Sequence, residues 1–158
     1  MSIFIAHDVR LTGKTPTSYA QWNLGESISL AQFVAGFRNW AAGQSGLHTL
    51  KMWAHGKPGQ LQFCYEWIWL PTVEQLRPIE PYVNRIDIYG CQLARIGSGP
   101  NEDGNMLCCR LAQITQSHVR ASTATQYYDY HGGPGDSMNF GTGRNGADLR
   151  SERSGRKS

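Results

Sequence analysis

The chain has 158 residues, a formal net charge of +3 and four cysteines, and this length suits one domain that buries its own core without disulfide or metal support. No cluster of Cys and His has the spacing of zinc ligands, which excludes the common zinc modules and favours reduced thiols, no metal and no cofactor. No run approaches the roughly 18 apolar residues of a membrane helix, and no basic segment precedes the apolar start of the chain. We therefore expect a cytoplasmic protein without a membrane span, unless export leaves its signal uncleaved.

The positive charge lies at the end of the chain. Residues 144–158 hold five basic and two acidic side chains, which accounts for the whole net charge of +3. A basic segment can contact phosphates, but a Gly-, Ser- and Arg-rich segment without apolar periodicity is typical of a solvated tail. We expect one domain over residues 1–130 and a flexible tail over residues 131–158, and nucleic acid is not the expected partner.

The chain begins with a predicted strand that is followed by a helix. Residues 2–9 form a buried strand, because an apolar, β-branched run precedes a turn region that contains Gly13 and Pro16. In residues 27–43 the apolar side chains recur at three- and four-residue steps, as they do on one face of a helix. This order suggests a crossover between parallel strands.

A second strand is predicted over residues 47–55 and ends at His55. After a Gly-Pro-Gly turn, residues 60–70 alternate like a short exposed ribbon, with Trp67 and Trp69 on one face. We expect both indole rings to be buried, although a lid or a partner surface would use the same pattern.

The remaining segments complete an α/β pattern. Residues 72–83 begin as a helix that Pro78 and Pro81 break. Three further segments follow: a strand over 85–91, an amphipathic helix over 104–116 that contains Cys108 and Cys109, and a strand over 118–123. Strands that alternate with helices predict a mainly parallel sheet with helices on both faces and a site at the carboxyl ends of the strands.

His55 and Cys91 each follow a predicted strand. If these strands are neighbours, both side chains meet at one rim, where an imidazole can take the proton of a thiol. The N–H groups of Gly56 and Cys91 could then form an oxyanion hole, and Gly90 would permit the turn that presents the thiol. A histidine at a strand end and a small buried cysteine are also ordinary structural residues, so a purely structural role stays open.

Three stretches carry a resemblance to a known family: "HGKPGQLQ" at 55–62, "IDIYGCQLA" at 86–94 and "LAQITQSHVRAST" at 111–123. Their order resembles the caspase-like fold of cysteine peptidases, which includes caspases, gingipains and CHAT domains. It is most similar to a bacterial domain of uncharacterised function found near the start of large repeat-bearing surface proteins. The resemblance covers about residues 3–130. It is more specific for the fold than for the activity, because some caspase-like domains lack activity.

The resemblance implies a cysteine endopeptidase that acts on a protein or peptide substrate. Cys91 would be the nucleophile and His55 the acid/base, while the amides of Gly56 and Cys91 would hold the oxyanion. Caspases have Ala before the nucleophile where this chain has Gly90, a feature that the more similar bacterial domains share.

The same resemblance indicates which residues bind substrate. Ser122 and Thr123 fall in the last matching stretch, and the loop after the first strand offers Asp8 and Arg10 for the residue before the cut. A buried Asp8 carboxylate would favour cleavage after Arg or Lys. Alternatively Arg10 selects Asp, or Asp8 only caps the turn before Gly13.

Two classes of function therefore remain from the sequence. One is a thiol peptidase with the His55–Cys91 dyad, and the other is a catalytically silent caspase-like scaffold that acts as an interaction or signalling module. A regulatory protein partner fits both classes, and a phosphate- or membrane-contacting tail is a third, weaker reading.

Overall fold

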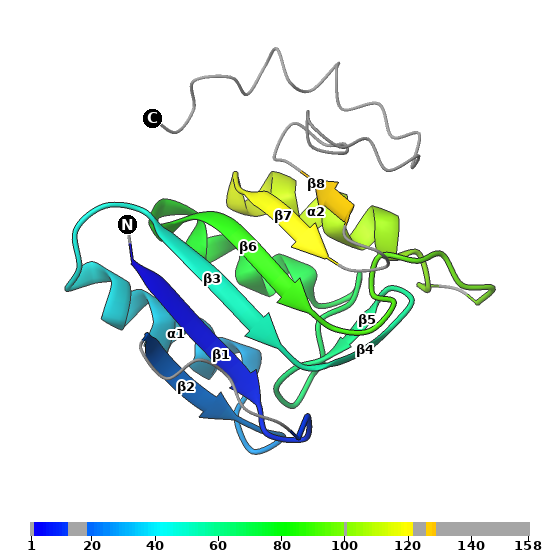
Figure 1. Ribbon diagram of the computed structural model, residues 1–158, viewed down its shortest axis with the longest axis horizontal. Helices are drawn as coiled ribbons and strands as arrows, with labels where there is room; N and C mark the ends of the chain where they lie inside the picture. Colours follow the sequence, from blue (N-terminus) through cyan, green and yellow to red (C-terminus); the bar gives the residue numbers. More distant parts are fainter. Residues whose placement is uncertain (1, 13–18, 100, 122–125, 129–158) are drawn as a thin grey trace, which may run out of the picture.

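The computed structural model describes residues 2–12, 19–99, 101–121 and 126–128. Its centre is a six-stranded sheet in the order β2-β1-β3-β6-β7-β8 (Figure 1). Five strands are parallel, and β8 pairs antiparallel with β7. The strands are β1 (Ile3–Asp8), β2 (Ala20–Leu24), β3 (His48–Trp53), β6 (Val83–Tyr89), β7 (His118–Ala121) and β8 (Gln126–Tyr128). The prediction of a mainly parallel α/β fold is confirmed.

Strands β3 and β6 are direct neighbours. They run in register with Trp53 opposite Tyr89, so both end at the same edge of the sheet. The chain therefore leaves the two strands side by side and enters the segments that hold His55 and Cys91. Whether these strands were adjacent could not be read from the sequence, and the proposed dyad depends on it.

The helices begin at the residues that can cap them. Ser29 accepts a hydrogen bond from the N–H of Gln32 and starts α1 (Leu30–Ala42), and Asp103 does the same for Met106 at the start of α2 (Gly104–Thr115). Between them lies η1 (Val73–Tyr82), a 3₁₀ helix that packs against both. The predicted helix over 72–83 is thus a single 3₁₀ segment that runs through its two prolines.

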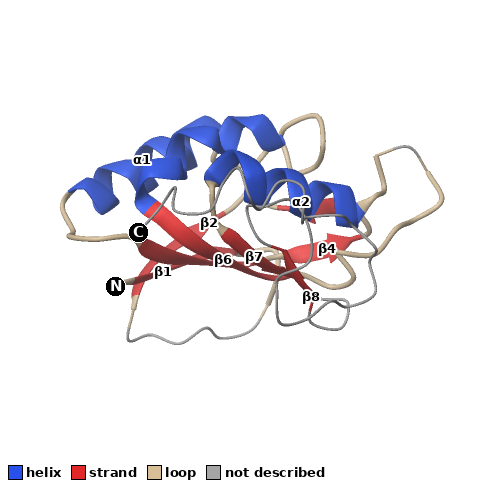
Figure 2. Ribbon diagram, turned by 90° about the horizontal axis from the view of Figure 1, so that it is seen from above, coloured by secondary structure: helices blue, strands red, loops and turns tan. Residues whose placement is uncertain are grey.

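All the helices among the described residues lie on one face of the sheet (Figure 2), whereas the sequence led us to expect helices on both. The strands show why. In β6, Ile86 and Ile88 are buried in the core, but Arg85 and Tyr89 on the opposite face are partly exposed. A strand covered on both faces would be apolar throughout, so this alternation is the signal of a half-covered sheet.

Strand β2 was not predicted. Its alternate residues Ala20, Trp22 and Leu24 face the helices, and the Trp22 ring lies so close to Gly36 of α1 that a Cβ there would clash. The turn residues before β2 obscured this short edge strand.

The second predicted strand is also shorter than expected. Strand β3 ends at Trp53, and His55 begins a separate strand, β4 (His55–Lys57), which pairs antiparallel with β5 (Gln60–Gln62). This β4–β5 hairpin lies beyond the carboxyl edge of the large sheet (Figure 1).

Within the described ranges, no helix is both long and apolar enough to cross a membrane.

Candidate functional site

The site is formed where the backbones that follow β3 and β6 touch. The N–H of Ala54 donates to the carbonyl of Tyr89 at 3.2 Å. A Cβ on Gly56 would lie 2.9 Å from the carbonyl oxygen of Cys91, and a Cβ on Gly90 would lie 3.2 Å from the carbonyl oxygen of Ala54. A side chain at position 56 would collide with backbone and one at position 90 would be tightly packed, so the two glycines let the His55 and Cys91 segments approach each other.

The imidazole of His55 is exposed and is held by a backbone carbonyl. Its Nε2 atom lies 3.0 Å from the carbonyl oxygen of Arg10, in the loop after β1. Because a carbonyl only accepts, Nε2 must carry the proton in this contact. In the neutral ring Nδ1 is then the nitrogen with a lone pair, which is the form that a general base requires.

Cys91 is the exposed one among the four cysteines. Burial, followed by the charges of Asp8 and Glu66, raises the pKa of the Cys64 thiol to about 12. Burial likewise raises the pKa of Cys108 well above its usual range. Since the thiolate is the nucleophile, burial and a raised pKa disfavour reaction at Cys64 and Cys108, and Cys91 is the accessible thiol.

The N–H of Gly56 lies outside the β4–β5 ladder. Leu61, its partner in β5, exchanges both of its backbone hydrogen bonds with Ile68 at 2.9 Å. The Gly56–Leu61 pair is therefore a non-hydrogen-bonded pair of the ladder. In such a pair the N–H of Gly56 points away from β5, and the oxyanion role of this amide stays a prediction.

Asp8 is fully buried and its carboxylate is saturated by hydrogen bonds. One oxygen accepts from the backbone N–H of Arg10 at 3.1 Å and from its Nε at 2.7 Å. The other accepts from Nη2 of Arg10 at 2.7 Å and from the backbone N–H of Cys64 at 3.1 Å. A carboxylate has about four acceptor sites, so none is left for a substrate cation.

Arg10 is committed to the same network. Its Nη2 also donates to the carbonyl of Cys64 at 2.8 Å, and the hydrogen bond to Asp8 raises the pKa of the guanidinium. Among the three roles considered for this pair, the geometry favours a turn-capping Asp8. Ser122 and Thr123, the other residues predicted to bind substrate, lie outside the described residues.

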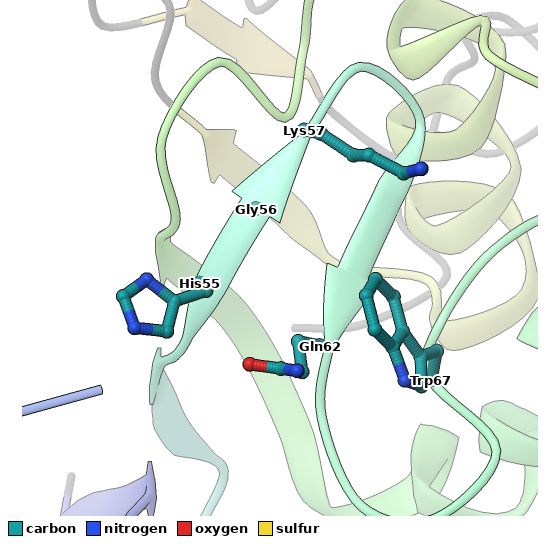
Figure 3. A pocket seen from close by; sticks show the side chains of 5 residues that line it. All are labelled: His55, Gly56, Lys57, Gln62 and Trp67. Atoms are coloured by element: carbon teal, nitrogen blue, oxygen red, sulfur yellow. The ribbon is translucent and has the colours of Figure 1, made fainter. Parts of the chain in front are cut away.

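A shallow hollow of about 140 Å³ lies beside His55 and is lined by His55, Gly56, Lys57, Gln62 and Trp67. In Figure 3 the Lys57 side chain extends across the hairpin on the side of Trp67, and His55 projects from the opposite edge. Sequence reasoning did not assign Lys57, Gln62 or Trp67 to the site. The two-residue alternation of the hairpin could have indicated Lys57 and Gln62, since both share the face of His55.

A family model described as "Domain of unknown function (DUF4347)" matches residues 29–144. The chain belongs to the DUF4347 family. No curated protein and no solved structure matches this DUF4347 chain. The matched region contains His55, Gly56 and Cys91, whereas Asp8 and Arg10 precede it.

In this DUF4347 domain the backbone segments that hold the predicted catalytic residues thus adjoin, and the predicted specificity residues have a different surrounding from the one expected. His55, Gly56 and Cys91 lie on adjoining backbone segments. Asp8 and Arg10 lie next to them but are bound to each other. Within the described ranges, no cluster of three or more His, Cys, Asp or Glu side chains could hold a metal ion.

Proposed function

We propose that this domain is a cysteine peptidase in which Cys91 is the nucleophile and His55 the acid/base. The observation that carries the proposal is the hydrogen bond from Nε2 of His55 to the Arg10 carbonyl. In nucleophile–base pairs a third group orients the base, and here the Arg10 carbonyl orients the imidazole in this way. The same hydrogen bond leaves Nδ1 available for the thiol proton. The contact of Gly56 with the backbone of Cys91 supports the same assignment.

The reaction follows from these groups. Nδ1 of His55 takes the proton of Cys91, and the sulfur attacks the peptide carbonyl carbon while the N–H groups of Gly56 and Cys91 hold the oxyanion. The C–N bond breaks as the His55 imidazolium gives its proton to the leaving amine. Water, deprotonated by His55, then cleaves the thioester and releases the carboxyl product and the Cys91 thiol.

The hollow beside His55 suits an extended segment of polypeptide. It is shallow and has an indole wall from Trp67, an amide from Gln62 and an ammonium group from Lys57. These groups can contact backbone and side chains next to the bond that is cut. The predicted preference for Arg or Lys before that bond requires a substrate cation to displace Arg10 from Asp8.

The test is incubation of the protein with a complex mixture of peptides, followed by mass spectrometry of the new termini. We expect new termini with the wild-type chain and none with Cys91→Ala or His55→Ala. The residue before each cut reports the preference for basic or acidic side chains directly. Identical spectra for wild type and Cys91→Ala would contradict the proposal and leave the catalytically silent scaffold.

A further inference from the structure

The loop after β1 is a turn that is built around one buried carboxylate. The N–H of Leu11 donates to the carbonyl of Asp8 at 2.9 Å and closes the turn, and the N–H of Arg10 donates to the Asp8 side chain. The backbone of residues 8–11 is thus held both by its own hydrogen bond and by the Asp8 carboxylate. Within this turn, the carbonyl of Arg10 is the atom that contacts His55.

The same carboxylate ties the turn to a segment from another part of the chain. Asp8 accepts from the N–H of Cys64, and Arg10 donates to the carbonyl of Cys64. Cys64 has a positive φ of 60°, a conformation that few non-glycine residues adopt, and its side chain is fully buried. Because Cys64 lies in the segment that follows β5, the network fixes the β1 loop relative to the chain that leaves the hairpin of His55.

A buried charge is stable only when it is paired and hydrogen-bonded. Asp8 meets this condition entirely with Arg10 and Cys64, so it has no acceptor left for a ligand. Its effect on the site passes instead through the backbone of Arg10. The Arg10 side chain is 24% exposed and that of Asp8 is fully buried, so only the arginine side of this ion pair reaches solvent.

We propose that Asp8 is a positioning residue of the dyad: through Arg10 it fixes the carbonyl that orients the His55 imidazole. This inference rests on the proposed function of His55 and Cys91. It replaces a role in substrate selection with a role in the geometry of the general base. The cleavage of a substrate would then depend on Asp8 whatever the sequence of that substrate.

The test uses Asp8→Asn, which keeps the shape of the side chain but replaces one acceptor oxygen with a donor. The measurement is the pH profile of the rate at which iodoacetamide alkylates Cys91. Iodoacetamide has no peptide side chain, so a residue that only selects substrates does not alter this rate. We expect the rate at pH 7 to fall about tenfold and the profile to approach that of His55→Ala.

The matched control is Asp87→Asn. Asp87 is 2% exposed and pairs with Nε of Arg85 at 2.9 Å, but it lies within β6 on the face of the sheet without described helices. It therefore controls for the loss of a buried, arginine-paired carboxylate. We expect its Cys91 profile to match the wild type. The ionisable groups around Asp8, namely Arg10, Cys64, Glu26 and Glu66, are unchanged in both variants.

Each outcome is decisive. If Asp8→Asn behaves like the wild type while His55→Ala is slower, the positioning role is wrong and the dyad stands. If wild type and His55→Ala are equal, the dyad and the inference both fail. If Asp8→Asn does not fold, the variant Arg10→Lys is measured instead. This variant keeps the backbone carbonyl of residue 10 but loses the paired hydrogen bonds from Nε and Nη2 to Asp8. A wild-type profile in that variant would likewise overturn the inference.

Discussion

The same side chain occupies opposite surroundings at Cys91 and Cys108. Cys91 is exposed at the carboxyl edge of the sheet, where two backbone segments touch through Gly56 and Gly90. Cys108 is fully buried in α2, and burial raises its pKa well above the usual range. The edge consists of turns and glycines and exposes a thiol to solvent, whereas the core consists of packed apolar side chains that stabilise the fold. Substitutions in the two regions should therefore have separable effects.

The largest effect is expected at Cys91. Cys91→Ala should abolish peptide cleavage completely, because it removes the nucleophile. The exposed side chain contributes little packing, so the free energy of unfolding should change by less than about 1 kcal/mol. Denaturant unfolding and the peptide-cleavage assay test this together. Residual cleavage equal to wild type would place the chemistry at another residue.

Replacement of His55 comes next. His55→Ala removes the acid/base and should lower kcat/KM for a cleaved peptide by about 10²–10⁴-fold, the range of general acid–base catalysis. His118→Ala is a suitable control, because His118 is an exposed histidine at the opposite edge of the sheet. Equal losses in both variants would mean that His55 has no special role.

Gly56→Ala should affect both regions in part. The added Cβ would lie 2.9 Å from the carbonyl oxygen and 3.3 Å from the nitrogen of Cys91, and backbone cannot move aside as a flexible side chain can. We expect about tenfold slower cleavage and a loss of about 1–3 kcal/mol of stability, as for overpacking. Gly43→Ala, where the Cβ has ordinary contacts at 3.5 Å, should leave cleavage unchanged. Unaltered cleavage in Gly56→Ala would show that the contact is not needed.

The smallest effect on reactivity is expected in the core. Cys108→Ser places a hydroxyl in a fully buried position and should cost about 1–3 kcal/mol of unfolding free energy. Cleavage and the alkylation of Cys91 should match the wild type at temperatures where the variant is folded. A loss of activity without a loss of stability would show that α2 affects the site, and it would contradict the separation of the edge from the core.

Much of the fold could be predicted because strong local patterns specify it. The apolar run of β1 and the helical spacing from Leu30 to Trp40 reflect what each segment buries, and both patterns are local. The parallel sheet followed from their order. The order of strands and helices does not distinguish one helical layer from two, whereas the alternation of polar and apolar residues in β6 does.

The candidate site could be predicted only as far as residue types allow. His55, Gly56 and Cys91 could be proposed because each lies after a predicted strand of a parallel sheet, and because the stretches around them resemble the caspase-like fold. Their catalytic roles stay predictions. The saturation of Asp8 depends on the backbone of Cys64, which is 56 residues away. Such a contact has no local sequence signal, so the sequence left three roles open for Asp8.

The central claim is that His55 activates Cys91. The most direct measurement is the second-order rate constant for iodoacetamide at each of the four cysteines at pH 7, in the wild type and in His55→Ala. We predict that Cys91 reacts faster than the three buried cysteines and that loss of His55 slows it by about tenfold or more. Equal Cys91 rates in the two proteins would contradict the account, and His55 would then be a structural residue of the hairpin.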